Sequence, residues 1–186
     1  MKKFFLTMIA ALMAVGVSAQ VYVGGSIGFG TVRNYDFGND HTDGVFKFLP
    51  EVGYSFNEHW AVGGVIGYQK GDWDFVDGIT LQDVSTEAFV IQPYVRYTFF
   101  RSRYINALVD GVVGFTDYFD VARHYRVGLA PAVAVNLTEK LSFVSHFGFL
   151  GYNSIYGRDH SGIDEIHAFG LDLDGNDITF GLYYSF

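Results

Sequence analysis

The chain contains no cysteine and only three prolines in 186 residues. Without cysteine it can have no disulfide bond, no thiol nucleophile and no thiolate metal site. Basic residues are also scarce, since 12 Lys and Arg accompany 20 Asp and Glu and give a net charge of −8. Such an acidic balance excludes a nucleic-acid-binding protein. After the first twenty residues no apolar run is long enough for a membrane-spanning helix, so the chain could enter a membrane only as strands.

The first twenty residues, MKKFFLTMIAALMAVGVSAQ, hold the one extended apolar stretch. Lys2 and Lys3 precede it, and small residues follow it up to Ala19, which is the arrangement of a secretory signal peptide. A membrane-anchor helix is the alternative, but a helix needs about 20 apolar residues to cross a bilayer. We therefore expect a signal peptide over residues 1–19 and a single domain over residues 20–186.

Glycine and aromatic residues are abundant, with 23 glycines and an aromatic content of 18%. Apolar residues recur at every second position, a period that indicates β-strands with one apolar face. Eight strands are expected near residues 21–32, 44–56, 60–70, 87–100, 104–116, 123–136, 141–152 and 177–186. Tight turns follow the second, fourth and sixth strands, and longer loops follow the others, the longest over residues 153–176. This alternation predicts an all-β, eight-stranded antiparallel up-and-down barrel.

Two kinds of barrel have this alternation, and the smaller side chains decide between them. In a soluble, lipocalin-like barrel the bulky residues point inward, whereas in a membrane barrel they face lipid. The set opposite the bulky residues is Gly, Ala and Ser with isolated charges, unlike a water-facing surface. The membrane barrel is therefore predicted. The side chains expected to face lipid include Val23, Ile27, Phe48, Ile91, Val95, Val113, Val133, Phe143, Phe147, Phe149 and Phe180.

Aromatic residues gather near the tight-turn ends of the strands, which is typical of an interfacial girdle. They are Tyr54, Phe56, Trp60, Tyr97, Phe99, Tyr104, Tyr184 and Phe186. With both ends of the domain on this side, the last strand must pair with the first to close the sheet and to satisfy backbone groups that lipid cannot.

The signal peptide, the eight strands, the alternating loop lengths and the terminal Phe186 resemble the small outer-membrane barrels of the OmpA/OmpX type, in the outer membrane protein β-barrel domain group. The resemblance implies an integral outer-membrane location with the long loops outside. It also implies that the barrel-assembly machinery recognises the alternating C-terminal residues Phe180, Leu182, Tyr184 and Phe186. No periplasmic peptidoglycan-binding domain is expected, because the last strand ends the sequence.

Seven polar residues fall on the expected inward face and form a candidate interior network. They are Lys47, Glu51, Gln92, Arg96, Asp110, Arg126 and His146. Unpaired charges in a narrow lumen are costly, so we expect Arg96 to pair with Asp110 or Glu51. Eight strands leave room for little besides side chains, which favours a plug over the alternative of a narrow porin or ion channel.

Acidic residues cluster in three expected loops, at residues 38–44, 71–78 and 172–177. One hypothesis is that they bind divalent cations that bridge to lipopolysaccharide phosphates. The alternative, which is more common for any single cluster, is that they are solvated turn residues. The segment DLDGND does not have the spacing of an EF-hand loop.

Some eight-stranded barrels modify lipid A with His, Ser and an acid near the outer rim. The candidates here are His41, Asp43, His160, Ser161, Asp164, Glu165 and His167. Loop composition alone often produces such sets, and none of them forms a family motif. We therefore expect no catalytic residue, no cofactor and no bound metal.

Pro50, Pro93 and Pro131 lie at one height on three strands. Proline removes a ladder donor, so we expect a local bulge or bend at each of them.

The sequence thus predicts a monomeric outer-membrane barrel with a structural or surface-interaction role. Its expected partners are outer-membrane lipid and lipopolysaccharide, the barrel-assembly machinery and an unknown partner outside the cell. The narrow porin and the lipid A-modifying enzyme are the alternatives.

Overall fold

The computed structural model describes residues 20–36, 39–70, 87–119, 121–158, 165–172 and 179–186. The expected signal peptide lies outside these residues. No helix in the described part is long and apolar enough to span a bilayer. The strands are β1 (Gln20–Asp36), β2 (Asn39–Ser55), β3 (Trp60–Lys70), β4 (Glu87–Arg101), β5 (Ile105–Tyr118), β6 (Ala122–Asn136), β7 (Leu141–His146), β8 (Phe149–Gly157), β9 (Ile166–Asp172) and β10 (Thr179–Ser185).

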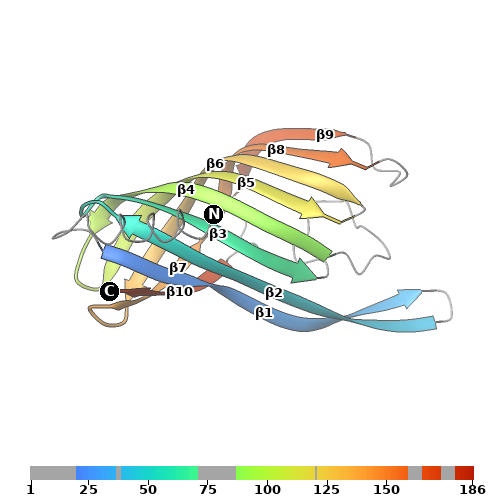
Figure 1. Ribbon diagram of the computed structural model, residues 1–186, viewed down its shortest axis with the longest axis horizontal. Coiled ribbons are helices and arrows are strands. Elements are labelled where there is room, and N and C mark those ends of the chain that lie inside the picture. Colours follow the sequence, from blue (N-terminus) through green and yellow to red (C-terminus); the bar gives the residue numbers. More distant parts are fainter. Residues whose placement is uncertain (1–19, 37–38, 71–86, 120, 159–164, 173–178) are drawn as a thin grey trace, which may run out of the picture.

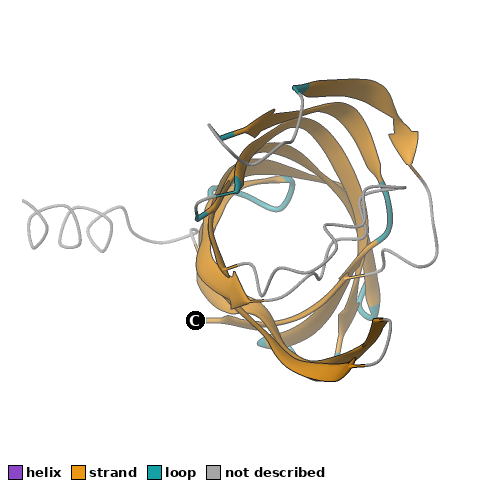
Figure 2. Ribbon diagram, turned by 90° about the vertical axis from the view of Figure 1, so that its right-hand side faces the viewer, coloured by secondary structure: helices purple, strands orange, loops and turns teal. Residues whose placement is uncertain are grey.

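These ten segments form one closed antiparallel barrel of eight strands (Figures 1 and 2). Each strand from β1 to β6 pairs with the next, and β1 pairs with β10 to close the sheet. Strands β7 and β8 both pair with β6, so they are two halves of the seventh barrel strand. Likewise β10 pairs with β7 and β9 with β8, so β9 and β10 form the eighth. The predicted eight-stranded barrel is confirmed.

Two of the connections expected to be long loops are partly strand. Strands β1 and β2 pair as far as Asp36 and Asn39, so most of the first expected loop belongs to a long hairpin. Strand β9 lies inside the region expected as the longest loop, where it pairs with β8 from Asp172 to Ile166. Its alternation of Phe169 and Leu171 with small residues is too short to stand out in the sequence.

Each of the three tight turns is held by a side-chain oxygen near its start. The Asn57 side chain accepts hydrogen bonds from the backbone N–H of His59 at 2.8 Å and of Trp60 at 2.9 Å. The Ser102 hydroxyl accepts one from the next strand at 3.0 Å, and so does the Thr138 hydroxyl, also at 3.0 Å. Such side-chain bonds are the reason that Asn, Ser and Thr favour turns.

The bulky and the polar residues face opposite sides of the wall, as predicted. Phe180 is 54% exposed on the outside, whereas Arg96 is 7% exposed and Asp110 2% exposed inside. This orientation contradicts a soluble carrier barrel, which would have its apolar set inside. A second set of outward aromatics lies toward the long-loop end. It includes Phe29, Phe46, Tyr68, Phe89, Tyr125, Tyr156 and Phe169. The outer surface therefore has an apolar belt between two aromatic girdles, as a bilayer requires.

The seventh barrel strand contains a bulge that reverses its alternation. Ala132 pairs with His146 and Leu129 with Leu150, so three residues of this strand oppose two of β6. Gly148, at a φ of 89°, takes up the extra residue, because only glycine adopts this backbone conformation without strain. Phe149 is consequently buried inside the barrel, and the prediction that it faces lipid is wrong.

Each of the three prolines lies at an interruption of the ladder, but only one of them lies at a bulge. Pairing of β2 with β3 lapses at Leu49 and Pro50, and pairing of β4 with β5 lapses at Gln92 and Pro93, with the same register on either side. On their other sides these strands stay paired, which keeps them in register. Pro131 lies opposite the bulge in the seventh strand. Pro50 and Pro93 thus interrupt the ladder without a bulge, and of the predicted bulges or bends only the bulge opposite Pro131 is seen in the register.

Candidate functional site

Three tyrosines point into the barrel, and each ring lies over a glycine on the neighbouring strand. The pairs are Tyr22 with Gly53, Tyr94 with Gly63, and Tyr183 with Gly24. A Cβ atom on Gly53 would lie 2.1 Å from the Tyr22 ring, and one on Gly63 would lie 2.3 Å from the Tyr94 hydroxyl. The glycines therefore provide the space that lets bulky rings fit inside an eight-stranded barrel.

The guanidinium of Arg96 lies in the middle of these rings. Its Cζ is 4.9 Å from the Tyr94 ring centroid, 5.4 Å from that of Tyr183 and 5.6 Å from that of Tyr22. Aromatic faces attract a cation at such distances, and the attraction grows when water is excluded. The side chain also forms two parallel hydrogen bonds with Asp110, Nε to Oδ1 and Nη2 to Oδ2, both 2.8 Å long. This bidentate geometry is the strongest that arginine makes with a carboxylate.

Glu51 is held from three sides. The hydroxyls of Tyr94 and Tyr183 both donate to its carboxylate, the second at 2.6 Å, and Arg96 Nη2 lies 3.6 Å from its Oε1. Because the Tyr94 proton is directed at Glu51, the Tyr22 hydroxyl donates to the Tyr94 oxygen at 2.6 Å. These contacts join residues of β1, β2, β4 and β10 across the lumen.

Asp110 completes the layer on the other side. Besides Arg96 it accepts a hydrogen bond from His146 Nε2 at 2.8 Å. The layer thus has two carboxylates, one guanidinium, three tyrosine hydroxyls and one imidazole, and both carboxylates and the guanidinium are bonded to neighbours. A buried charge needs such partners, and a fully bonded network rigidifies its surroundings. We call this group of seven residues the polar layer: Tyr22, Glu51, Tyr94, Arg96, Asp110, His146 and Tyr183.

The other three residues of the predicted network lie higher in the barrel, toward the long-loop end. Arg126 stacks over the inward Phe149, with its Cζ 4.3 Å from the ring centroid. It also crosses Gly114, where a Cβ atom would lie 2.5 Å from Arg126 Cγ and 3.3 Å from Gln92 Oε1. Lys47 is half-buried on β2, between Gly28 of β1 and Gln69 of β3 in the ladder. The structure therefore separates the predicted network into the polar layer and a second, upper group.

The three tyrosines of the polar layer were absent from the sequence-based network. Tyr22 and Tyr183 occupy inward positions in the strand alternation, but large aromatics were expected only outside. Their positions in the sequence do indicate an inward direction, because each tyrosine lies between two outward residues, as Tyr22 does between Val21 and Val23. Glycines on the adjacent strands provide room for such rings. Which glycine lies opposite which tyrosine depends on the strand register, and the sequence does not specify that register.

A hydrogen-bonded chain of a serine, a histidine and a glutamate lies on the outer face of β8 and β9. Ser154 Oγ lies 2.8 Å from His167 Nδ1, and His167 Nε2 lies 2.8 Å from Glu165 Oε1. The residue types are those of a hydrolase triad. However, Ser154 is only 2% exposed, and the Tyr152 hydroxyl lies 2.5 Å from the same Nδ1. The serine is covered and its base is shared, so the arrangement holds the histidine ring in place.

The remaining candidates for chemistry cannot be assembled into a site. His160, Ser161, Asp164 and residues 71–78 lie outside the described residues, as do most of residues 172–177. His41 and Asp43 belong to β2, but their side chains are not described. Within the described part of the chain no group of three His, Asp or Glu side chains could hold a metal ion.

Comparison with known proteins agrees with this architecture. A family model described as outer membrane protein beta-barrel domain matches residues 4–186. A comparison with curated protein sequences gives no match.

Proposed function

The chain belongs to the outer membrane protein beta-barrel domain family, and we propose that this integral outer-membrane barrel has a structural and surface-interaction role, with its lumen closed to ions. The observation that carries the proposal is the polar layer. Its two carboxylates and its guanidinium are buried, mutually bonded and surrounded by tyrosine rings. An ion-conducting lumen needs hydrated, weakly held charges, because an ion must be able to leave its site as well as enter it.

Conductance across a planar bilayer tests this proposal. The wild-type barrel is expected to show no steady single-channel current. Removing two rings in the double variant Tyr94→Ala/Tyr183→Ala is expected to create one, because water can then replace the aromatic wall around Arg96. Tyr184→Ala is the matched control, since this neighbouring ring is 40% exposed on the outside. A steady current through the wild-type barrel would show that the protein is a narrow channel.

The partners that we propose follow from the outer surface. Beyond the aromatic girdle near the long-loop end lie ion pairs, Lys70 with Glu87 at 3.9 Å and Arg158 with Asp117 at 2.7 Å. Charged groups at this height support contacts with lipopolysaccharide and, through the loops, with partners outside the cell.

Phe186, whose backbone N–H bonds to Val21 at the closing seam, supports recognition by the barrel-assembly machinery. A monomer is proposed, since barrel closure leaves no sheet edge near the tight turns.

We propose further that the barrel does not modify lipid A. Ser154→Ala and the wild-type protein are expected to leave the lipid A of the host membrane identical, because the serine is covered and cannot reach a substrate. Mass spectrometry of lipid A from cells with and without the barrel measures this. Loss of an acyl chain with the wild-type protein, but not with Ser154→Ala or His167→Ala, would identify a hydrolase instead.

A further inference from the structure

The closing seam of the barrel is short and ends in a fork. Strand β1 pairs with β10 only from Tyr22 to Gly25, although it pairs with β2 over its whole length. If the pairing of β1 with β10 continued in the same register, Ile27 would lie opposite Phe180. Neither residue has a partner across the seam. Gly25 has a φ of 139°, which places the change of direction at the last paired residue.

Above the fork the two sides of the barrel separate. The outer half of the β1–β2 hairpin and the β8–β9 pair lie apart at the long-loop end (Figures 1 and 2). Among the described residues, β9 pairs only with β8, and the part of β1 beyond Gly25 pairs only with β2. In the part of the chain that the structure describes, no strand pairing continues the seam beyond Gly25.

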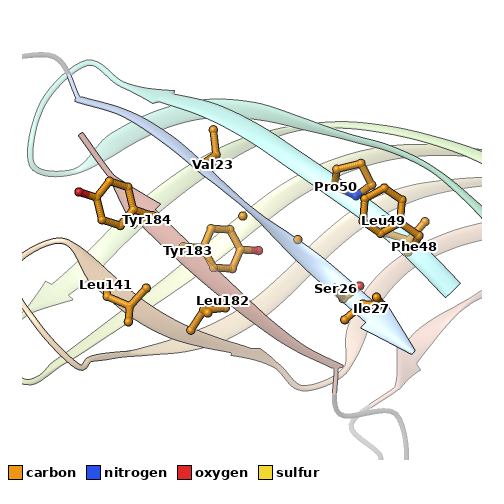
Figure 3. A pocket seen from close by; sticks show the side chains of 12 residues that line it. Val23, Ser26, Ile27, Phe48, Leu49, Pro50, Leu141, Leu182, Tyr183 and Tyr184 are labelled. Carbon is orange, nitrogen blue, oxygen red and sulfur yellow. The ribbon is translucent and has the colours of Figure 1, made fainter. Parts of the chain in front are cut away.

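A groove of about 400 Å³ lies at the fork (Figure 3). Its lining comes from both faces of the wall. Ile27, Phe48 and Leu182 belong to the outward, lipid-facing set, whereas Ser26, Leu49 and Tyr183 belong to the inward set. A continuous sheet keeps these two sets on opposite sides. Their meeting in one groove means that the groove passes through the wall.

We propose that this groove, which we call the seam groove, binds an acyl chain of a lipid from the surrounding outer membrane. The inference goes beyond the structural role proposed above and needs only that the barrel spans the membrane. The groove opens onto the apolar belt, above the tight-turn girdle at Tyr184 and below the outward aromatics Phe29 and Phe46. It therefore lies at the depth of hydrocarbon, where the material that reaches it is lipid chain.

The chemistry of the lining fits an acyl chain. Its side chains are almost all aliphatic or aromatic, and a lipid chain that enters it exchanges one apolar environment for another while it fills the space between strands. At Gly24, Gly25 and Ser26 there is little side chain to obstruct the entrance. At the inner end the Tyr183 ring, fixed by its hydroxyl bond of 2.6 Å to Glu51, separates the groove from the charged residues of the polar layer.

Two cysteine pairs test the opening in the wall, and the absence of native cysteine makes each pair unique. The pair Val23→Cys/Tyr184→Cys replaces partners within the seam, where the spacing of paired strands suits a disulfide. The pair Ile27→Cys/Phe180→Cys occupies the equivalent register above the fork. With oxidant in lipid bilayers, the first pair is expected to cross-link and the second to stay reduced. Equal cross-linking of both pairs would show a closed seam and overturn the proposal.

Fluorescence quenching by brominated acyl chains tests the lipid itself. In a Trp60→Phe/Trp73→Phe background, Leu49→Trp places an indole at the inward side of the seam groove. Its fluorescence is expected to fall in brominated bilayers as far as that of Phe48→Trp, its outward neighbour. Val90→Trp is the matched control, because Val90 faces inward and is 9% exposed on β4, away from the seam, and its fluorescence should not change.

A variant that fills the seam groove with a side chain tests whether the quenching comes from a lipid chain bound there. Ser26→Phe, added to Leu49→Trp, is expected to abolish the quenching because the ring takes the place of the lipid chain. If Leu49→Trp is quenched no more than Val90→Trp, or if Ser26→Phe changes nothing, no acyl chain occupies the seam groove. The cysteine pairs introduce no bulky side chain, so they decide the question of the opening even if a tryptophan variant fails to fold.

Discussion

Replacing Asp110 by alanine is expected to lower the free energy of unfolding by about 3–5 kcal/mol, because it leaves a buried guanidinium without its partner. Arg96 would lose both of its 2.8 Å hydrogen bonds, and Glu51, at 3.6 Å, is already engaged by two tyrosines. His146 would lose its acceptor at the same time. Urea unfolding in detergent micelles, followed by tryptophan fluorescence, measures the loss.

Asp117→Ala is the matched control for this prediction. Asp117 lies on the same strand and pairs with Arg158 at 2.7 Å, but the two side chains are 22% and 33% exposed. Partly exposed pairs contribute about 0–1 kcal/mol, so a small change is expected. The double variant Arg96→Met/Asp110→Leu should recover most of the lost stability, since it removes both buried charges together. Equal destabilisation by Asp110→Ala and Asp117→Ala would contradict the role assigned to the polar layer.

Gly63→Ala is expected to destabilise the barrel by about 1–3 kcal/mol, the usual consequence of overpacking a closely packed interior. The new Cβ atom would lie 2.3 Å from the Tyr94 hydroxyl. That hydroxyl donates to Glu51 and accepts from Tyr22, so it cannot move without breaking bonds to both. The same urea titration detects the change.

The neighbouring Gly64→Ala separates this packing effect from a general effect of alanine in the strand. At Gly64 the nearest atoms to a new Cβ are 3.8 Å away, an ordinary contact distance. Alanine is also better than glycine within a strand by about 0.5–1 kcal/mol, because glycine loses more conformational freedom on folding. Gly64→Ala should therefore be neutral or stabilising. A similar loss in both variants would mean that Tyr94 yields to the extra methyl group and that its position is not fixed.

The number of strands and the direction of their faces could be predicted because both depend on local alternation. Strand β4, for example, keeps a period of two over residues 87–99, and this alternation is visible without knowledge of how the strand pairs with its neighbours. The position of Arg96 beside Asp110 also followed from the sequence, since both residues lie on the inward face at similar distances from the tight turn that joins their strands.

The interior tyrosines and the fork at Gly25 could not be predicted in the same way. Whether a ring fits inside depends on which glycine lies opposite, and for Tyr183 that glycine, Gly24, is far away in the sequence. The length of the closing seam likewise depends on how β1 and β10 meet after all other strands have paired. Neither feature leaves a periodic signal in either strand alone, so a reading of local patterns misses both.

The bulge at Phe147 and Gly148 divides the seventh barrel strand into two segments whose side chains alternate with opposite parity. Before it, even-numbered residues such as His146 point into the lumen, and after it odd-numbered residues such as Phe149 do. Deletion of Gly148 would therefore leave both faces intact, because it would remove the bulge and restore a period of two. Phe149 would still lie beside Arg126 and Ser154 beside His167. A deletion between Phe149 and Ser154 would instead turn Ser154 into the lumen, since every position beyond it would change face.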